Sequence, residues 1–378
     1  MRTIRELDWR QWVPEPEGAA FVMCSDFPDV PGLWDLSLRP EVIPHWMAIL
    51  RANMRYLQQI VETQGHQEQV EAAQDIAMIL DGLFRDLEGG GAAAEVRTIH
   101  EVTLIRDNLL RSNGLIDPYW EIKAREAERL MPQARGALRE AWESGGGESG
   151  KPALAGLLAG MLGGNLFDLG SRSTQEAFCK GQLDTEAACA RFRPWVAQTL
   201  RDMEPEAADL LFPRPRQLGE PPEGRVILFA DNAGADFLLG VLPMALFLAR
   251  RWEVWIAVNS LPSSSDIAIE EACALLAGLR SGAEDPVALA MHSGRLRLVA
   301  SGTGSPGIDL RYVGAELNRV AHDASWILLE GQGRGIETNW TTRFRCTVFR
   351  LAVVKDALVA QELGLEPNSP VLRCDRGA

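Results

Sequence analysis

Apolar side chains recur at three- and four-residue steps through the first half of the chain. The clearest repeat, within residues 41–63, runs through Trp46, Ile49, Leu50, Met54, Leu57 and Val61. Further apolar helical segments occupy residues 69–87, 98–111, 119–143 and 152–169. This spacing places the apolar positions on one face of a helix. Residues 1–217 are therefore predicted to form a mainly helical lobe, whose last apolar helix breaks at Gly163 and Gly164.

Beyond the proline-rich stretch 213–224 the pattern changes to short apolar runs that alternate with helical segments. The runs cover residues 226–230, 254–258, 296–300 and 326–329. A short apolar run fits a strand that is buried on both faces, and strands that alternate with helices form a mostly parallel sheet. Residues 218–378 are therefore predicted to form an α/β lobe with a doubly wound, Rossmann-like sheet.

Polar residues follow directly after two of these runs. Asp231 and Asn232 end the first run, and Asp266 follows the second run after a serine-rich turn. Ligands bind at the carboxyl ends of the strands in open α/β sheets, so these three side chains are expected to meet there. Two carboxylates and an amide suit a hard divalent cation such as magnesium or manganese. Helix N-capping is the alternative role for each of these residues taken singly.

A glycine-rich loop follows the fourth run and begins with Glu330 and Gly331. Gly331 and Gly333 let backbone N–H groups approach an anion closely, and Arg334 has the forked shape that binds a phosphate through two hydrogen bonds. The loop is therefore a candidate phosphate-binding site. A plain strand-to-helix turn with a solvated arginine is the alternative.

Three polar residues in apolar surroundings are further candidates. Lys355 lies in an apolar stretch, where a lysine is costly to bury unless it meets an anion. Asn165 and Asp168 share one face of an otherwise apolar helix, and this face is a candidate for contact with a ligand. A snorkelling lysine and a satisfied core network are the alternatives.

One motif supports a different function. The segment Gly302-x-Gly304-x-x-Gly307 follows the third run, and Glu330 lies at roughly the spacing of the dinucleotide-binding fingerprint. An NAD(P)-dependent oxidoreductase is therefore the alternative function. Gly145 to Lys151 imitates a P-loop, but Pro152 stands where that motif needs serine or threonine, so we interpret it as a linker.

Composition and motifs argue against several classes of binding partner. The net charge of −14 argues against a nucleic-acid surface. The sequence shows no apolar run long enough to span a bilayer and no apolar signal core at its start. The cysteines form no CxxC pair and the histidines no ligand-like pair, which argues against zinc. We expect a cytoplasmic protein without nucleic-acid or membrane partners; the oligomeric state stays open.

Taken together, several ordered motifs resemble the damage-control phosphatases, which carry the acidic-residue-methyltransferase-like metal-binding domain. The resemblance runs from about Ile105 to Gly364. The motifs are Leu115–Tyr119 with Lys123, Gly164–Asp168, Asp231–Gly234, Ser265-Asp266, Glu330–Arg334 and Phe344–Lys355. The chain is most similar to the branch that includes the phosphatase domain of pantothenate kinase 4. It departs from that branch at Gln332, where methionine is usual, and at Ser265 and Ala268, where asparagine and threonine are usual.

The resemblance implies a metal-dependent hydrolase of small phosphomonoesters, with 4′-phosphopantetheine and its damaged forms as substrates. It implies that Asp231, Asn232 and Asp266 hold a divalent metal: manganese, nickel or cobalt, with magnesium possible. Asp231 is the predicted catalytic residue. Asn165, Asp168, Glu330, Gly331, Gly333, Arg334 and Lys355 are the predicted substrate- and phosphate-binding residues. A carboxyl methyltransferase and a metabolite sensor without turnover are further alternatives.

Overall fold

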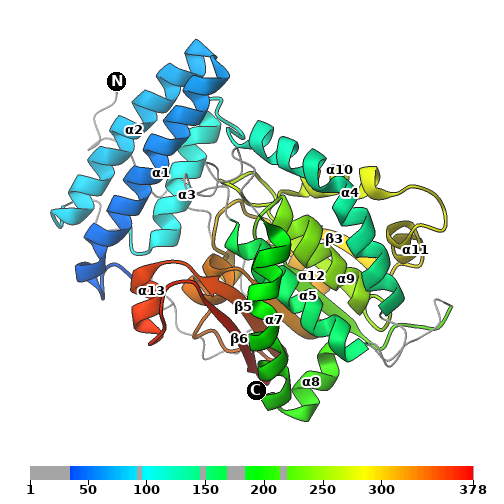
Figure 1. Ribbon diagram of the computed structural model, residues 1–378. Coiled ribbons are helices and arrows are strands. Elements are labelled where there is room, and N and C mark those ends of the chain that lie inside the picture. Colours follow the sequence, from blue (N-terminus) through cyan, green and yellow to red (C-terminus); the bar gives the residue numbers. More distant parts are fainter. Residues whose placement is uncertain (1–34, 92–95, 145–149, 168–183, 213–218, 378) are drawn as a thin grey trace.

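The protein is built around a six-stranded sheet with helices on both faces (Figure 1). The computed structural model describes residues 35–91, 96–144, 150–167, 184–212 and 219–377. The strands are β1 (Arg225–Phe229), β2 (Glu253–Val258), β3 (Leu296–Ala300), β4 (Ala324–Glu330), β5 (Thr347–Val354) and β6 (Ser369–Asp375). They lie in the order β3-β2-β1-β4-β5-β6. All neighbours pair in parallel except β5 and β6, which are antiparallel.

Helices come before the sheet. They are η3 (Pro40–Val42), α1 (Ile43–Gln64), α2 (Gln67–Glu88), α3 (Ile99–Ser112), α4 (Trp120–Ser144), α5 (Gly150–Leu166), α7 (Thr185–Asp202) and α8 (Pro205–Leu211). Of these, α1 to α5 correspond to the five predicted helical segments, whereas α7 and α8 were not predicted. The helix α3 begins with a capping box, in which Thr98 and Glu101 satisfy each other's backbone N–H groups. In the described residues no helix has the length and apolar character that crossing a membrane requires.

The helices between and after the strands cover the sheet. They are η5 (Asp236–Val241), α9 (Leu242–Leu248), α10 (Ile269–Leu279), α11 (Pro286–His292), η6 (Leu310–Tyr312), α12 (Ala315–Ala321), η7 (Gln332–Glu337) and α13 (Ala357–Glu362). The segments η5 and η7 are short π-helices, and each is the first helix after a strand, β1 for η5 and β4 for η7. Such π-turns are frequent at functional sites.

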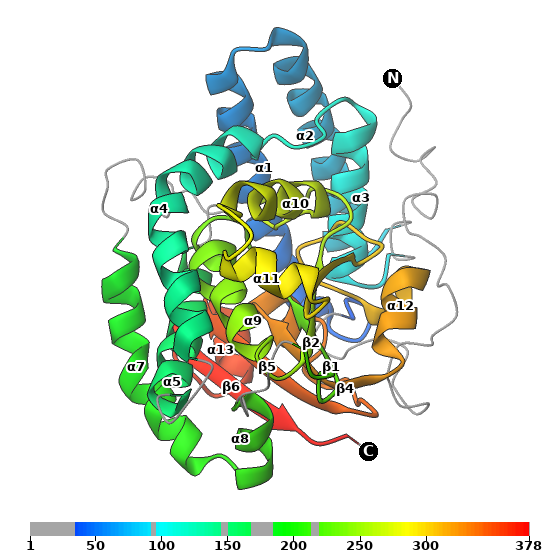
Figure 2. The same cartoon turned by 90° about the vertical axis from the view of Figure 1, so that its right-hand side faces the viewer.

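Alternate residues of β1 pack on opposite faces of the sheet. Val226 and Leu228 join a core with α4, α5, α7 and α9. Ile227 and Phe229 join a smaller core on the other face, to which α12 contributes. In Figure 2 the helix α12 lies apart from the other helices. The predicted doubly wound α/β fold is therefore confirmed, and the runs predicted as strands form β1 to β4.

The helices α1, α2 and α3 form a bundle with a core of its own, which α13 and the end of β5 complete (Figure 1). In contrast, α4, α5 and α7 share the main core with the sheet. The division of the chain into two lobes near residue 217 stays a prediction.

The predicted break at Gly163 and Gly164 was wrong, because α5 continues through both glycines to Leu166. These glycines permit close packing instead. A Cβ on Gly163 would lie 2.9 Å from the Cys189 sulfur, and one on Gly164 would lie 2.6 Å from the Cα of Asp236. The two glycines thus bring α5 against α7 and η5, beside the segment that follows β1.

Candidate active site

Polar residues gather at the carboxyl ends of the central strands. β1 pairs with β2 on one side and with β4 on the other, so the chain reverses its direction across the sheet at this point. Ligands of open α/β sheets bind at such a switch point. Two backbone hydrogen bonds tie the segments after β1 and β2 together, from Ala233 N to Ser265 O (2.9 Å) and from Ile267 N to Asp231 O (3.1 Å).

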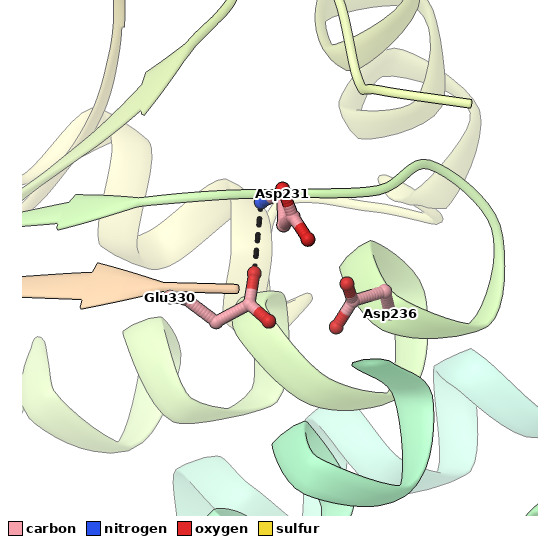
Figure 3. Close-up of side chains that lie close together, drawn as sticks. All are labelled: Asp231, Asp236 and Glu330. Atoms are coloured by element: carbon pink, nitrogen blue, oxygen red, sulfur yellow. Dashed lines mark hydrogen bonds between the residues drawn. The ribbon is translucent and has the colours of Figure 1, made fainter. Parts of the chain in front are cut away.

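Three buried carboxylates meet at this switch point (Figure 3). One oxygen from each of Asp231, Asp236 and Glu330 lies within 4.8 Å of the others. Glu330 Oε2 accepts a hydrogen bond from the Asp231 backbone N–H at 2.8 Å. Within the described part of the chain, Asp236 Oδ1 and Glu330 Oε1 are buried without a hydrogen-bond partner. Unpartnered buried carboxylate oxygens are costly, so this cluster favours a cation or a proton.

The carboxylates of the cluster carry like charges, which repel one another. Burial, with the neighbouring charge of Asp231, raises the pKa of Asp236 to about 7. Burial and both aspartate charges raise the pKa of Glu330 well above its usual value. In the absence of another cation, the cluster therefore retains protons near neutral pH.

Arg334 lies between the two aspartates that were predicted to share a metal. Its guanidinium forms one ion pair with Asp231 Oδ1 and another with Asp266 Oδ2 at 2.7 Å. Burial opposes the charged form, but Asp266 and Asp231 outweigh it and raise the pKa of Arg334. Asp231 and Asp266 thus face one fully buried cation.

Asn232 joins these groups through its side-chain amide. Its Nδ2 donates to Asp231 Oδ2 and to Asp236 Oδ2, each at 3.1 Å. Its Oδ1 accepts from Ser265 Oγ at 2.8 Å. Asn232 therefore lies next to the predicted partners, but its amide would have to rotate before the oxygen could bind a cation.

Two further predicted residues lie at the site: Asn165 from the helical region and Lys355 from the end of β5. Asn165, at the end of α5, donates to Asp231 Oδ2 at 3.0 Å and to Asp236 Oδ2 at 3.3 Å. Lys355 Nζ donates to the backbone oxygen of Asn165 at 3.0 Å. Asp168, predicted on the same helix face, lies outside the described residues.

Close contacts require the glycines at the start of η7, Gly331 just before it and Gly333 within it. Gly331 has φ +92°, and a Cβ there would lie 2.3 Å from Asp231 Cγ. A Cβ on Gly333 would lie 2.4 Å from the carbonyl oxygen of Pro306. The N–H of Gly331 already donates to Leu351 O at 2.9 Å. Phosphate binding by these two residues stays a prediction.

Gln332, which departs from the related branch, has a clear structural role. Its Oε1 accepts from the backbone N–H groups of Lys355 (2.5 Å) and Asp356 (3.1 Å). Its Nε2 donates to Glu337. These bonds fix the backbone from which Lys355 extends, which a methionine at this position would not do.

A pocket of about 530 Å³ lies beside the site, between the N-terminal bundle and the strand-end loops. Its lining from the bundle includes Trp46, Ile49, Leu50, Asn53, His100, Thr103 and Arg106. Leu166, Pro306, Gln332 and Lys355 line the side next to the carboxylates. The pocket thus combines apolar walls with cations and opens beside residues that contact Asp231.

The alternative dinucleotide motif does not have the required setting. The loop Gly302–Gly307 follows β3, at the far edge of the sheet, and the next α-helix begins only at Ala315. The N–H of Gly302 donates to Ser260 Oγ at 2.6 Å. The fingerprint needs a helix that starts within the glycine loop and points its N-terminus at the pyrophosphate.

Three residues of the site were missed in the sequence. Asp236 follows Asn232 by four residues, one helical turn, and this spacing was the available signal. Asn259 donates to Asp266 Oδ2 and accepts from Arg334. Glu126 of α4 accepts from the Ala235 N–H at 3.2 Å, and no sequence pattern indicated it.

Glu126 gives the metal-free protein a predictable pH dependence. Burial, assisted by the charges of Asp236 and Glu271, raises its pKa from 4.5 to about 8 despite the hydrogen bond from Ala235. The folded protein therefore holds a proton that the unfolded chain releases, and the free energy of unfolding falls between about pH 5 and 8. Glu126→Gln should reduce this fall by on the order of 2 kcal/mol in urea unfolding without divalent metal.

The matched control is Glu128→Gln, which changes an exposed glutamate on the same helix. It should leave the pH dependence of stability as it is in the wild type. Parallel curves for the wild type and Glu126→Gln would contradict the assignment of this proton to Glu126.

The chain is similar to known phosphatases over most of its length. The family profile described as "Damage-control phosphatase ARMT1-like domain" matches residues 47–371. A damage-control phosphatase of Arabidopsis thaliana is 33% identical over 298 residues, which are 77% of this chain and 75% of that protein. A 4′-phosphopantetheine phosphatase of Mus musculus is 27% identical over 349 residues, or 78% of this chain and 40% of that protein.

Two further similarities differ in extent. Pantothenate kinase 2 of Arabidopsis thaliana is 33% identical over 283 residues, which are 68% of this chain but only 30% of that protein. The crystal structure of a DUF89 family protein from Pyrococcus horikoshii matches with a TM-score of 0.54 at 18% identity, covering 88% of this chain and 98% of that one. This second similarity concerns the fold alone.

Proposed function

Since the chain belongs to the damage-control phosphatase ARMT1-like family, we propose that it is a metal-dependent phosphatase of small phosphomonoesters. The resemblance predicted from the sequence motifs is thereby confirmed. One observation supports the proposal most: buried carboxylates with two unpartnered oxygens lie beside a buried arginine at the switch point of the sheet. Anionic groups can hold a metal cation and a positive side chain can bind a phosphate, and metal-dependent phosphoester hydrolysis uses both.

The residues present fit a divalent cation. All of the candidate ligands carry oxygen, and among the described residues two buried carboxylate oxygens of the cluster have no hydrogen-bond partner. We propose Asp231, Asn232 and Asp266 as ligands, with Asp236 and Glu330 completing the acidic surroundings. Such a set suits manganese, cobalt, nickel or magnesium. When bound, the cation would polarise the phosphoryl oxygens and lower the pKa of a water molecule.

The chain's own residues would bind and orient the phosphoryl group. Arg334 would neutralise the charge that develops on the phosphoryl oxygens, and it would do so without moving far because its stem is fixed by packing. Lys355 would add a second positive charge from the pocket side. Asn165 would close the site from the end of α5, and Asp231 would orient the attacking water. The predicted contact of Asp168 with the substrate stays a proposal from the sequence alone.

The substrate would be a phosphomonoester with an organic group that fills the neighbouring pocket. The volume of about 530 Å³ and the apolar wall of Trp46, Ile49 and Leu50 support an organic group larger than a simple alcohol. A relative carries the name 4′-phosphopantetheine phosphatase. We therefore propose 4′-phosphopantetheine and related damaged phosphometabolites as the first substrates to test.

The test is a phosphate-release assay on metal-stripped protein. We expect no turnover without metal, and turnover of 4′-phosphopantetheine or another small phosphomonoester once manganese, cobalt, nickel or magnesium is added. Absence of phosphate release with every metal would reject the proposal. Saturable binding of NAD(P)H or of S-adenosylmethionine, followed by fluorescence or calorimetry, would then favour an oxidoreductase or a methyltransferase.

A further inference from the structure

Arg106 is a buried cation of α3 with unused hydrogen-bonding capacity. Its Nε donates to Asp107 Oδ1 at 2.7 Å, and Asp107 in turn accepts from Ser263 Oγ. Among the described residues, its two terminal nitrogens have no hydrogen-bond partner. Burial opposes its charge, but Asp107 outweighs this and raises the pKa of Arg106, so the side chain stays charged.

The free edge of this guanidinium has a place to bind a ligand. Arg106 lines the pocket of about 530 Å³ and also a smaller cavity of about 20 Å³. The small cavity has no room for a ligand group larger than one water. A ligand that uses the terminal nitrogens must therefore come from the large pocket.

His100 lies one helical turn before Thr103 and faces the same pocket. Its Nδ1 lies 3.2 Å from Ser305 Oγ, which fixes the orientation of the ring. Its Nε2 is buried and has no partner in the described part of the chain. A buried polar atom without a partner is costly, and a polar ligand group that reaches His100 from the pocket would relieve this cost.

The other charged residues that line the pocket already form hydrogen bonds or ion pairs within the protein. Lys355 donates to the backbone of Asn165, and Glu337 accepts from Gln332. Asp356 pairs with His45 at 3.0 Å and caps the start of α13. Arg106 is therefore the cation in this pocket, among the described residues, whose donors remain unused.

We propose that Arg106 and His100 form a subsite that binds a carbonyl or carboxylate oxygen in the organic part of the substrate. This inference rests on the proposed phosphatase function, and it names the group that the enzyme recognises beyond the phosphate. Apolar side chains of α1, Trp46 and Leu50, pack against the remainder of the organic group. The enzyme thereby prefers phosphomonoesters that carry such an acceptor over plain alkyl phosphates.

The test compares two substrates in one variant. Arg106→Lys keeps the charge beside Asp107 but loses the planar fork. KM for 4′-phosphopantetheine, which carries amide carbonyls, should rise about tenfold, while KM for hexyl phosphate, which has no such acceptor, changes less than about twofold. The value of kcat should stay the same for both. His100→Phe, which keeps an aromatic ring of similar size, should raise only the first KM, by about threefold.

Arg111→Lys is the matched control, because Arg111 lies on α3 but donates to Pro262 and Asn108 and does not line the large pocket. Equal changes for both substrates, or no change for either, would overturn the subsite. Calorimetry with pantetheine, which lacks the phosphate, separates this failure from that of the proposed function. If the wild type released no phosphate from any ester, weaker pantetheine binding by Arg106→Lys would still support the subsite, and absence of binding by the wild type would reject it.

Discussion

Asp231→Asn is expected to lower kcat for phosphate release by about three orders of magnitude while the protein stays folded. Asp231 contacts Arg334, Asn165 and Asn232 and also belongs to the carboxylate cluster, a combination that no other described side chain shows. Asparagine keeps its volume but removes the charge that a divalent cation and the arginine both need. The measurement is a steady-state assay at saturating metal and substrate.

The stability of this variant should change little. Loss of the Asp231 charge weakens the pair with Arg334 but also removes the repulsion that raises the pKa values of Asp236 and Glu330. The thermal midpoint should therefore stay within a few degrees of the wild type. Asp323→Asn, at an exposed aspartate that pairs only locally with His322, is the control and should keep full activity. Wild-type activity in Asp231→Asn would rule out this site.

Arg334→Met is expected to destabilise the metal-free protein by about 3–5 kcal/mol, because it leaves Asp231 and Asp266 buried without their shared cation. Added manganese should restore part of this loss, since a cation between the same carboxylates would replace the guanidinium charge. Urea unfolding at pH 7, with and without manganese, measures both effects.

Arg85→Met is the control for this comparison. Arg85 is 76% exposed and pairs with Asp81 on the surface of α2, so its loss should cost less than about 1 kcal/mol and should not respond to metal. A free energy of unfolding of Arg334→Met that manganese does not raise would contradict a cation site at Asp231 and Asp266. In that case the arginine would be only a structural partner of the two carboxylates.

Local patterns were sufficient for most of the architecture. The period of the apolar positions predicted α1 to α4, and short apolar runs predicted β1 to β4. β5 and β6 were not predicted. The apolar run of β5 continues past Lys355 into α13 without a clear boundary, and β6 is a partly exposed edge strand of mixed polarity. Edge strands carry a weaker alternation because only part of their surface is buried.

Local sequence patterns were enough to predict the α/β class, the change from helices to strands after about residue 217, and the polar residues at the strand ends. These features depend on the chemistry of residues that are neighbours along the chain, so the sequence pattern alone reveals them. The contacts between these residues became known only from the folded chain: Arg334 meets Asp231 and Asp266, Asp236 lies close to Glu330, and Arg106 lines the pocket. Some of these contacts join residues about a hundred positions apart in the chain. Whether two such residues come close depends on the order and twist of the strands, and the local spacing of residues does not encode either.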